Sequence, residues 1–269
     1  MKKKQRSMSK ASFKKNTNTG TSISLTLLYP LAAIAVLIIL WQTACGLKLM
    51  PSFMLPSPMA VVRAFINDFS LISSHMGITV FEGASGLLIS VAVSFVLSIV
   101  MDSVSPLKKA VYPLLVLSQT VPVIAIAPLL VLWLGYGITP RIVLVVIMCF
   151  FPVTIGLLDG FASCDEDYIN LLKTMRASRF DIFAHAKLPM ALPSFFSSLK
   201  ISAAYSVIGA VIAEWVGGSA GLGVYMLRVR KSYSFDKMFA VIFLIMILSL
   251  LLMAIISILK KIFINYEGR

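Results

Sequence analysis

A polar stretch, Asp159–Pro193, reads DGFASCDEDYINLLKTMRASRFDIFAHAKLPMALP and separates two long apolar runs. Large apolar side chains recur within it at positions i, i+3, i+4 and i+7, which places them on one face of a helix. These residues are Tyr168, Leu171, Leu172 and Met175. The stretch is therefore predicted to contain an amphipathic helix and not an irregular loop.

Two further signals divide the stretch into a helix-turn-helix. The acidic residues 165–167 lie where negative charge stabilises a helix N-terminus. Ser178 and Asp181 have the spacing of a capping box that opens a second helix, and Pro189 and Pro193 are expected to end it. The hairpin either lies flat on a membrane surface or docks as a rigid part against a protein, and its paired caps favour docking.

Composition identifies the chain as an all-α polytopic membrane protein. It has 269 residues, of which 59% are hydrophobic and 13% charged, whereas soluble domains are about 25% charged. Residues 1–20 are rich in Lys, Ser, Thr and Asn and are predicted to be a disordered basic cytoplasmic tail. Residues 21–269 are assigned to one transmembrane domain, with a loop at about 161–195.

Six apolar runs are long enough to cross a hydrocarbon core of about 30 Å. They lie at about 25–45, 79–101, 110–134, 141–160, 196–216 and 238–259. Lys and Arg are more numerous in the segments that lie inside when both termini are inside, which predicts that orientation. Pro58 begins a short helix, to about Phe69, at the outer membrane surface.

The net charge of +13 does not indicate nucleic-acid binding, because the basic residues flank the spans instead of forming one patch with aromatic residues. Cys45, Cys149 and Cys164 are far apart in the sequence and are expected to be packing residues. The two histidines are isolated, so no metal site or bound cofactor is expected. The glycine-rich segment 217–223 lacks a phosphate-loop ending and is predicted to be a tight outer turn.

Polar residues within the spans are candidates for a transport pathway. Gln119, Thr120 and Pro122 either line a pathway or mark a packed, kinked helix, and the sequence leaves both alternatives open. The predicted orientation places Glu82 and Glu214 near the outer boundary, where the cost of an acid in the membrane falls sharply. They either anchor the chain at the interface or, for Glu214, shape an outer gate.

Several motifs resemble those of permease subunits of bacterial ABC importers, in particular the nitrate/sulfonate/taurine type. They include the Leu-Pro-Ser-Pro element at 55–58, Val121–Leu129 with Trp133–Gly137, and Ile208–Gly217. The Gly-Ala-Val-Ile-Ala-Glu-Trp form at 209–215 is most similar to members for pyrimidine precursors of thiamine. The hairpin resembles the family's cytoplasmic E-A-A-x-x-x-G loop, but Asn170-Leu171-Leu172 stand at the E-A-A positions and Arg176 stands in place of the glycine.

The resemblance implies an ABC importer permease fold and a function in the bacterial inner membrane. Two copies would form the pathway for a small organic solute, such as a sulfonate, nitrate, taurine or a pyrimidine precursor. The partners would be an ATPase subunit that uses ATP, an extracytoplasmic solute-binding protein and membrane lipid. The residues expected to couple to the ATPase are Asn170, Leu171, Leu172, Lys173, Met175, Arg176, Ala177, Leu188 and Pro189. Of these residues, Leu171, Leu172 and Met175 would be the anchors that become buried in the ATPase.

Two alternatives come from other functional classes. An intramembrane enzyme would need clustered acids, histidines or a Ser/Lys pair at one depth, whereas Glu82, Asp159 and Glu214 are expected at different depths. No catalytic residue is therefore assigned. A membrane scaffold would use the hairpin for a partner that is not an ATPase, and the proline-rich third span argues against it.

Overall fold

The computed structural model describes residues 19–51 and 53–264, and every regular element within them is helical. The predicted tail lies almost entirely in residues 1–18, outside the described residues, and helix α1 begins at Thr19. The chain divides into two compact units, residues 1–58 and 59–269.

The first unit contains helix α1 (Thr19–Gly46), of which Leu28–Gly46 is long and apolar enough to cross a membrane. This agrees with the first predicted span. Trp41 Nε1 donates a hydrogen bond to Pro56 O at 3.1 Å, and Cys45 Sγ lies 3.6 Å from Leu55 O. These contacts hold the segment after the helix against the end of α1.

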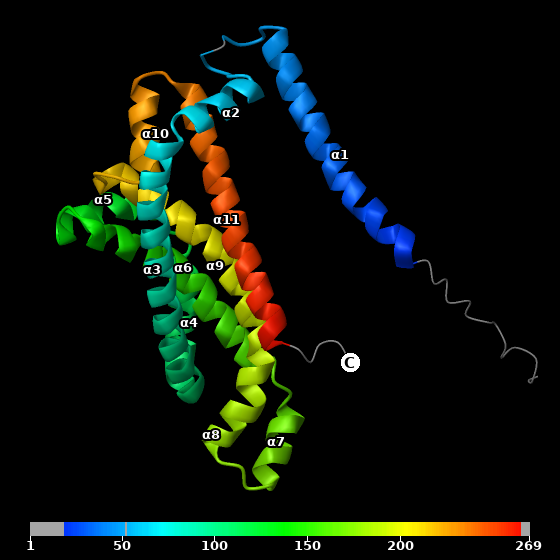
Figure 1. Ribbon diagram of the computed structural model, residues 1–269. Helices are drawn as coiled ribbons and strands as arrows, with labels where there is room; N and C mark the ends of the chain where they lie inside the picture. The colour runs from blue at the N-terminus through cyan, green and yellow to red at the C-terminus, as the bar shows by residue number, and fades with distance from the viewer. Residues whose placement is uncertain (1–18, 52, 265–269) are drawn as a thin grey trace, which may run out of the picture. The chain divides into compact units, whose positions relative to one another are not determined.

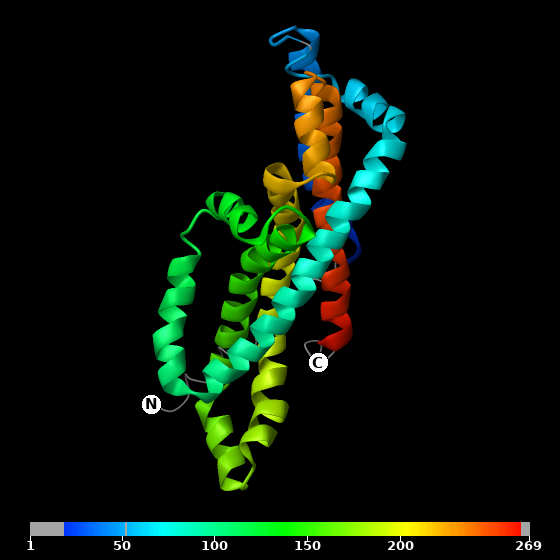
Figure 2. The ribbon, with the colours of Figure 1, turned by 90° about the vertical axis from the view of Figure 1, so that its left-hand side faces the viewer.

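The second unit is organised around helix α6 (Ile138–Ala162), which packs against both α3 (Phe69–Ser103) and α9 (Leu188–Gly217). Helix α11 (Phe235–Phe263) packs on α9, as both views show (Figure 1, Figure 2). Small residues allow the close approaches: a Cβ on Gly160 of α6 would overlap Ala191 of α9. Small residues at helix contacts are typical of membrane bundles.

The predicted third span, 110–134, is not one helix. Helices α4 (Ser105–Ser118) and α5 (Val123–Leu134) meet at an angle of 101°. Pro122 has no N–H and cannot continue the helix, while the Ser118 and Thr120 hydroxyls donate to backbone carbonyls at 2.7 Å. Within the described residues, five helices are long and apolar enough to cross a membrane, or six if this bent pair counts as one span.

Five short elements complete the second unit: α2 (Pro58–Asn67), α7 (Glu166–Thr174), α8 (Arg179–Ile182), the π-helical turn η1 (Phe183–Lys187) and α10 (Leu222–Lys231). Helix α2 confirms the predicted short helix after Pro58. Helices α7 and α8 form a hairpin beyond the ends of α6 and α9 (Figure 1, Figure 2). Residues 222–231 were predicted to be part of an outer loop, and in the structure they form helix α10.

The prediction that Pro189 and Pro193 end the second hairpin helix is wrong. The helix runs from Arg179 to Gly217 without a break. In the π turn, Leu188 N donates to Phe183 O, five residues earlier. This wider turn lies immediately before Pro189 and gives its ring room that a regular α-helix would not.

Candidate functional site

Both helices of the α7–α8 hairpin begin with the caps that the sequence predicts. The Asp165 carboxylate accepts a hydrogen bond from Asp167 N at 2.8 Å, and Glu166 adds negative charge to the first turn. Ser178 Oγ accepts from Asp181 N at 3.2 Å, while Asp181 Oδ2 accepts from Ser178 N at 3.0 Å. These reciprocal bonds form the predicted capping box.

Arg176 makes the turn between the two helices. Its φ of +59° is left-handed, the conformation that favours glycine. Arg176 N donates to Lys173 O at 2.9 Å, and Ala177 N donates to Leu172 O at 3.0 Å. This pair of bonds is a Schellman motif with Arg176 at the position usually occupied by glycine. The chain therefore forms the expected turn with arginine in place of glycine, at the cost of local backbone strain at Arg176.

One face of α7 presents large apolar side chains to solvent. Leu171 is 55% exposed and Met175 is 72% exposed, and Phe180 at the start of α8 is 75% exposed. Leu172, expected to be an equal anchor, is half-buried. Of the other residues expected to couple to an ATPase, Asn170, Lys173 and Arg176 are exposed, and Ala177, Leu188 and Pro189 are half-buried.

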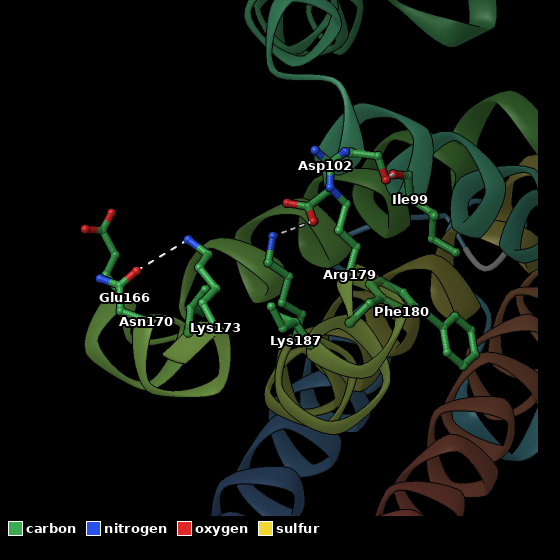
Figure 3. Close-up of a pocket in the computed structure, with 12 residues that line it drawn as sticks. Ile99, Asp102, Glu166, Asn170, Lys173, Arg179, Phe180 and Lys187 are labelled. Atoms are coloured by element: carbon green, nitrogen blue, oxygen red, sulfur yellow. Dashed lines mark hydrogen bonds and ion pairs between the residues drawn. The ribbon is translucent and has the colours of Figure 1, made fainter. Parts of the chain in front are cut away.

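The base of the hairpin is fixed to the helical bundle. Lys187 Nζ lies 2.7 Å from Asp102 Oδ2 at the end of α3, as Figure 3 shows. The rings of Phe161 and Phe183 contact edge to face, with centroids 5.4 Å apart. Cys164 is buried at the start of the hairpin, and burial raises the pKa of its thiol. The hairpin is thus a rigid extension of α6 and α9.

The residues expected to line a pathway lie at the bend between α4 and α5. Gln119, Thr120 and Pro122 are all exposed on the surface of the second unit. The bend therefore brings three polar or proline positions together at the point where the broken span changes direction. The assignment of these residues to a pathway stays a prediction.

Glu82 and Arg141 form a buried ion pair between α3 and α6. Arg141 Nη1 bonds to Glu82 Oε1, and the two side chains are 8% and 0% exposed. Arg141 Nε also donates to Gly137 O at 2.8 Å, and its Nη1 lies 3.4 Å from Ala220 O in the α9–α10 turn. Among the described side chains, Glu82 Oε2 is a buried oxygen without a hydrogen-bond partner. Glu82 is therefore paired inside the protein, so the interface-anchoring interpretation is wrong for it.

Glu214, the acid proposed for an outer gate, is also inside the protein, with 1% exposure. Its Oε1 accepts from Thr79 Oγ1 at 2.6 Å, and its Oε2 accepts from Gly223 N at 2.5 Å. Gly223 lies in the first turn of α10, where free N–H groups attract an anion. The carboxylate thus caps α10 from within the bundle and does not anchor the chain at the interface.

The glycine-rich turn wraps around this carboxylate. Gly221 has φ +125°, and a Cβ there would overlap the Glu214 carboxyl group. Gly221 N also donates to His75 Nδ1 at 2.9 Å, and Leu222 N donates to Thr79 Oγ1 at 2.8 Å. The sequence predicted a tight turn here but missed its enclosed acid and the partners on α3. The sequence contained one signal for the pairing of Glu214 with this segment, the four glycines at 217–223 that follow it closely.

A second polar contact joins the start of α3 to α10 and α11. Asp68 Oδ2 lies 2.7 Å from Lys237 Nζ and accepts from the Tyr225 hydroxyl at 2.7 Å. The hydrogen bond from Lys237 holds the pKa of Asp68 below its usual range. Burial, with Asp68 beside it, raises the pKa of the Tyr225 hydroxyl.

In the part of the chain that the structure describes, no three His, Cys, Asp or Glu side chains converge as a metal site would require. The polar groups found here pair with one another, with backbone groups or with cations of the chain. What the arrangement offers is a projecting hairpin, a broken span and a buried polar network.

Comparisons with known proteins agree with this arrangement. A family model described as binding-protein-dependent transport system inner membrane component matches residues 86–264. A probable ABC transporter permease protein of Haemophilus influenzae is 37% identical over 226 residues, 84% of this chain and 92% of that protein. The formylaminopyrimidine transport permease protein ThiX of Halalkalibacterium halodurans is 36% identical over 243 residues, 90% of this chain and 97% of that protein.

A solved structure shows the same fold. A chain of the inward-facing MetNI methionine ABC transporter aligns with a TM-score of 0.58 and 19% identity, covering 71% of this chain and 94% of that chain. The family match spans α6, α9 and α11, together with the hairpin whose apolar face is exposed. The chain belongs to the family of binding-protein-dependent transport system inner membrane components, as a multi-pass permease subunit of an ABC importer of the nitrate/sulfonate/taurine type.

Proposed function

We propose that the α7–α8 hairpin docks this permease onto its ATPase subunit and transmits ATP-driven movement to the spans. The observation that carries this proposal is the exposed apolar face of a rigid, projecting hairpin. Burial of Leu171, Met175 and Phe180 in a partner would contribute about 1.5–3 kcal/mol for each side chain. The family consists of transport permeases, so the chain is not an enzyme and the intramembrane-enzyme alternative is set aside.

The docking role assigns an orientation. If the hairpin meets a cytoplasmic ATPase, its end of the bundle is cytoplasmic, and the turn around Glu214 faces the outside. This agrees with the distribution of Lys and Arg, which favours both termini inside. The membrane is then the bacterial plasma membrane, with an extracytoplasmic solute-binding protein at the outer face.

The pathway is proposed to form between two copies of the chain. The bend at Gln119, Thr120 and Pro122 supplies exposed polar groups from a broken span, a feature tolerated where backbone lines a cavity. Glu214 and its enclosing turn would shape the outer gate, since this carboxylate fixes the start of α10. The second copy is proposed to be identical, which makes the permease a homodimer.

The proposed solute is a small aminopyrimidine. The support is the 36% identity to a relative named as a formylaminopyrimidine permease, together with the Gly-Ala-Val-Ile-Ala-Glu-Trp segment at 209–215. Sulfonates, taurine and nitrate are the competing solutes of this subfamily. Uptake of labelled formylaminopyrimidine by proteoliposomes, with each competitor in excess, distinguishes them once the binding protein is included.

The docking proposal is tested by purifying the tagged full-length chain in mild detergent and quantifying the ATPase that co-purifies. Met175→Asp places a charge on the exposed α7 face and should abolish ATPase recovery and transport without changing membrane insertion. Met175 is a cleaner position than Leu172, because a charge at a half-buried residue would also perturb folding. Leu47→Asp is the control, since Leu47 is 73% exposed in the segment after α1.

Equal ATPase recovery with the wild type and Met175→Asp would refute the docking role of this face. Loss of recovery with Leu47→Asp as well would show a general effect of an added charge. Retention of ATPase binding with loss of transport would instead place the role of Met175 in coupling and not in docking.

A further inference from the structure

A cleft of about 700 Å³ separates the end of α3 from the α7–α8 hairpin (Figure 3). Its walls come from three elements: Ile99 and Asp102 of α3, Lys173 of α7, and Arg179 and Lys187 of the α8–η1 segment. Neither the fold nor the docking role of the hairpin requires an open space here, because the Asp102–Lys187 ion pair already fixes the base of the hairpin.

The rim of the cleft has unpaired positive charge. Lys187 is neutralised by Asp102 at 2.7 Å. Lys173 Nζ has only a 3.3 Å bond to Asn170 Oδ1, and neither Lys173 nor Arg179 forms an ion pair with any described residue. Figure 3 shows the charged ends of Lys173, Lys187 and Arg179 along the same side of the hairpin. With Glu166 as the other acid, the lining has three cations and two anions and attracts a negatively charged ligand.

The back wall is apolar and continues from a membrane span. Ile99, Ile182 and Phe183 line the cleft. Helix α3 ends at Ser103, and Val96 and Val100, on its last turns, are 65% and 43% exposed. The cleft therefore opens where an apolar helix surface gives way to charged residues, which is the level of lipid headgroups.

The cleft lies on the opposite face of α7 from the proposed ATPase contact. Glu166, Ile169, Asn170 and Lys173 line it with a spacing of three or four residues. The exposed apolar residues Leu171 and Met175 fall on the other side of the same helix, about half a turn away. A ligand in the cleft and a protein on Leu171 and Met175 can therefore be bound at the same time, whereas Phe180, which also lines the cleft, would be shared by the two.

We propose that this cleft binds an anionic phospholipid, with the headgroup phosphate held by Lys173 and Arg179 and an acyl chain against Ile99 and Phe183. Arg179 supplies a planar donor fork that matches phosphate, and Lys173 supplies a second charge. The lipid is favoured over a free phosphate because the apolar wall adjoins the span, where a lipid chain is already present. The site would link the hairpin to the composition of the surrounding leaflet.

The test is native mass spectrometry of the full-length chain, released from nanodiscs of phosphatidylglycerol and phosphatidylcholine with matched acyl chains. The wild type should retain phosphatidylglycerol in preference to phosphatidylcholine. The Lys173→Ala/Arg179→Ala double variant should lose about thirtyfold in that preference, since each of the two basic residues near a lipid surface contributes about 1 kcal/mol. The control is Lys260→Ala/Lys261→Ala, which removes the same charge from the last turn of α11.

Three outcomes overturn the proposal. The first is equal retention of the two lipids by the wild type, and the second is an equal loss in the control. The third is displacement of the lipid by excess inorganic phosphate, which would assign the site to a free anion. Lipid binding is measured on the chain alone, without the ATPase, so this result does not depend on whether the hairpin also contacts an ATPase.

Discussion

Removal of Arg141 should destabilise the permease far more than removal of Arg141 together with Glu82. The pair is buried, with side chains 8% and 0% exposed. In Arg141→Met, the Glu82 carboxylate loses its cation partner in a site closed to water. In the Arg141→Met/Glu82→Leu double variant, no buried charge is left uncompensated.

The structure sets the expected magnitudes. Leaving a buried carboxylate unpaired costs about 3–5 kcal/mol, whereas replacing a whole buried pair by apolar residues is often close to neutral. Arg141 Nε also donates to Gly137 O at 2.8 Å, and loss of that bond costs both variants about 1–2 kcal/mol. The loss of the Gly137 bond is common to both variants, so the single variant should be less stable than the double variant by about 3–5 kcal/mol.

Thermal unfolding of the purified protein in detergent measures the difference. At about 2–4 °C for each kcal/mol, Arg141→Met should lower Tm by about 8 °C or more, and the double variant should lower Tm by less than half as much. Glu82→Leu alone should also be strongly destabilised, since it leaves Arg141 unpaired. Equal Tm values for Arg141→Met and the double variant would refute the reasoning, because they would show that the charge pairing contributes nothing.

Three other changes have defined outcomes. Arg176→Gly should relieve left-handed strain of about 1 kcal/mol and slow hydrogen exchange in the hairpin about fivefold; unchanged exchange would show that the turn is unstrained. Gly221→Ala should lower Tm, because the backbone at Gly221 has φ +125° and an added Cβ would overlap the buried Glu214 carboxyl group. Gly77→Ala should not lower Tm, because no atom lies within 4 Å of a Cβ at that position. Equal effects of the two substitutions would contradict the enclosed turn. Asp68→Asn should cost about 1–2 kcal/mol at neutral pH by loss of the Lys237 contact. Because the pKa of Asp68 is lowered, the Tm gap between wild type and variant should close as pH falls below about 4, and a pH-independent gap would exclude this contribution.

The hairpin was predictable in detail because its signals are local. The Asp165 cap, the Ser178–Asp181 capping box and the apolar face of α7 each depend on residues within one or two turns. Residues 170–172 and Arg176 were the recognised departures from the family pattern, and the hydrogen bonds around Arg176 form the expected turn. The continuation of the helix through Pro189 was not predictable, because no sequence signal indicates the π turn that precedes this proline.

The pairing of residues in the buried polar network could not be predicted from the sequence, for a different reason. Glu82 and Arg141 are 59 residues apart, and Thr79 and Glu214 are 135 apart, so their pairing depends on how α3, α6 and α9 pack. Estimates of depth from span boundaries placed the acids near the membrane surface. Packing between helices, which reduced their exposure to 1% or less, is a tertiary effect that periodicity does not encode.

The uninterrupted helix from Arg179 to Gly217 joins the α7–α8 hairpin to the turn around Glu214. Its 39 residues correspond to a rod of roughly 58 Å at 1.5 Å per residue. Phe180 is exposed near one end, and Glu214 caps α10 near the other. A tilt of about 5° at the hairpin would displace the far end of such a rod by about 5 Å, more than the length of any hydrogen bond around Glu214. If the hairpin docks onto an ATPase as proposed, the same helix is both the contact surface and a lever arm, and the strength of the Glu214 contacts sets how far it can tilt before the turn around Glu214 opens.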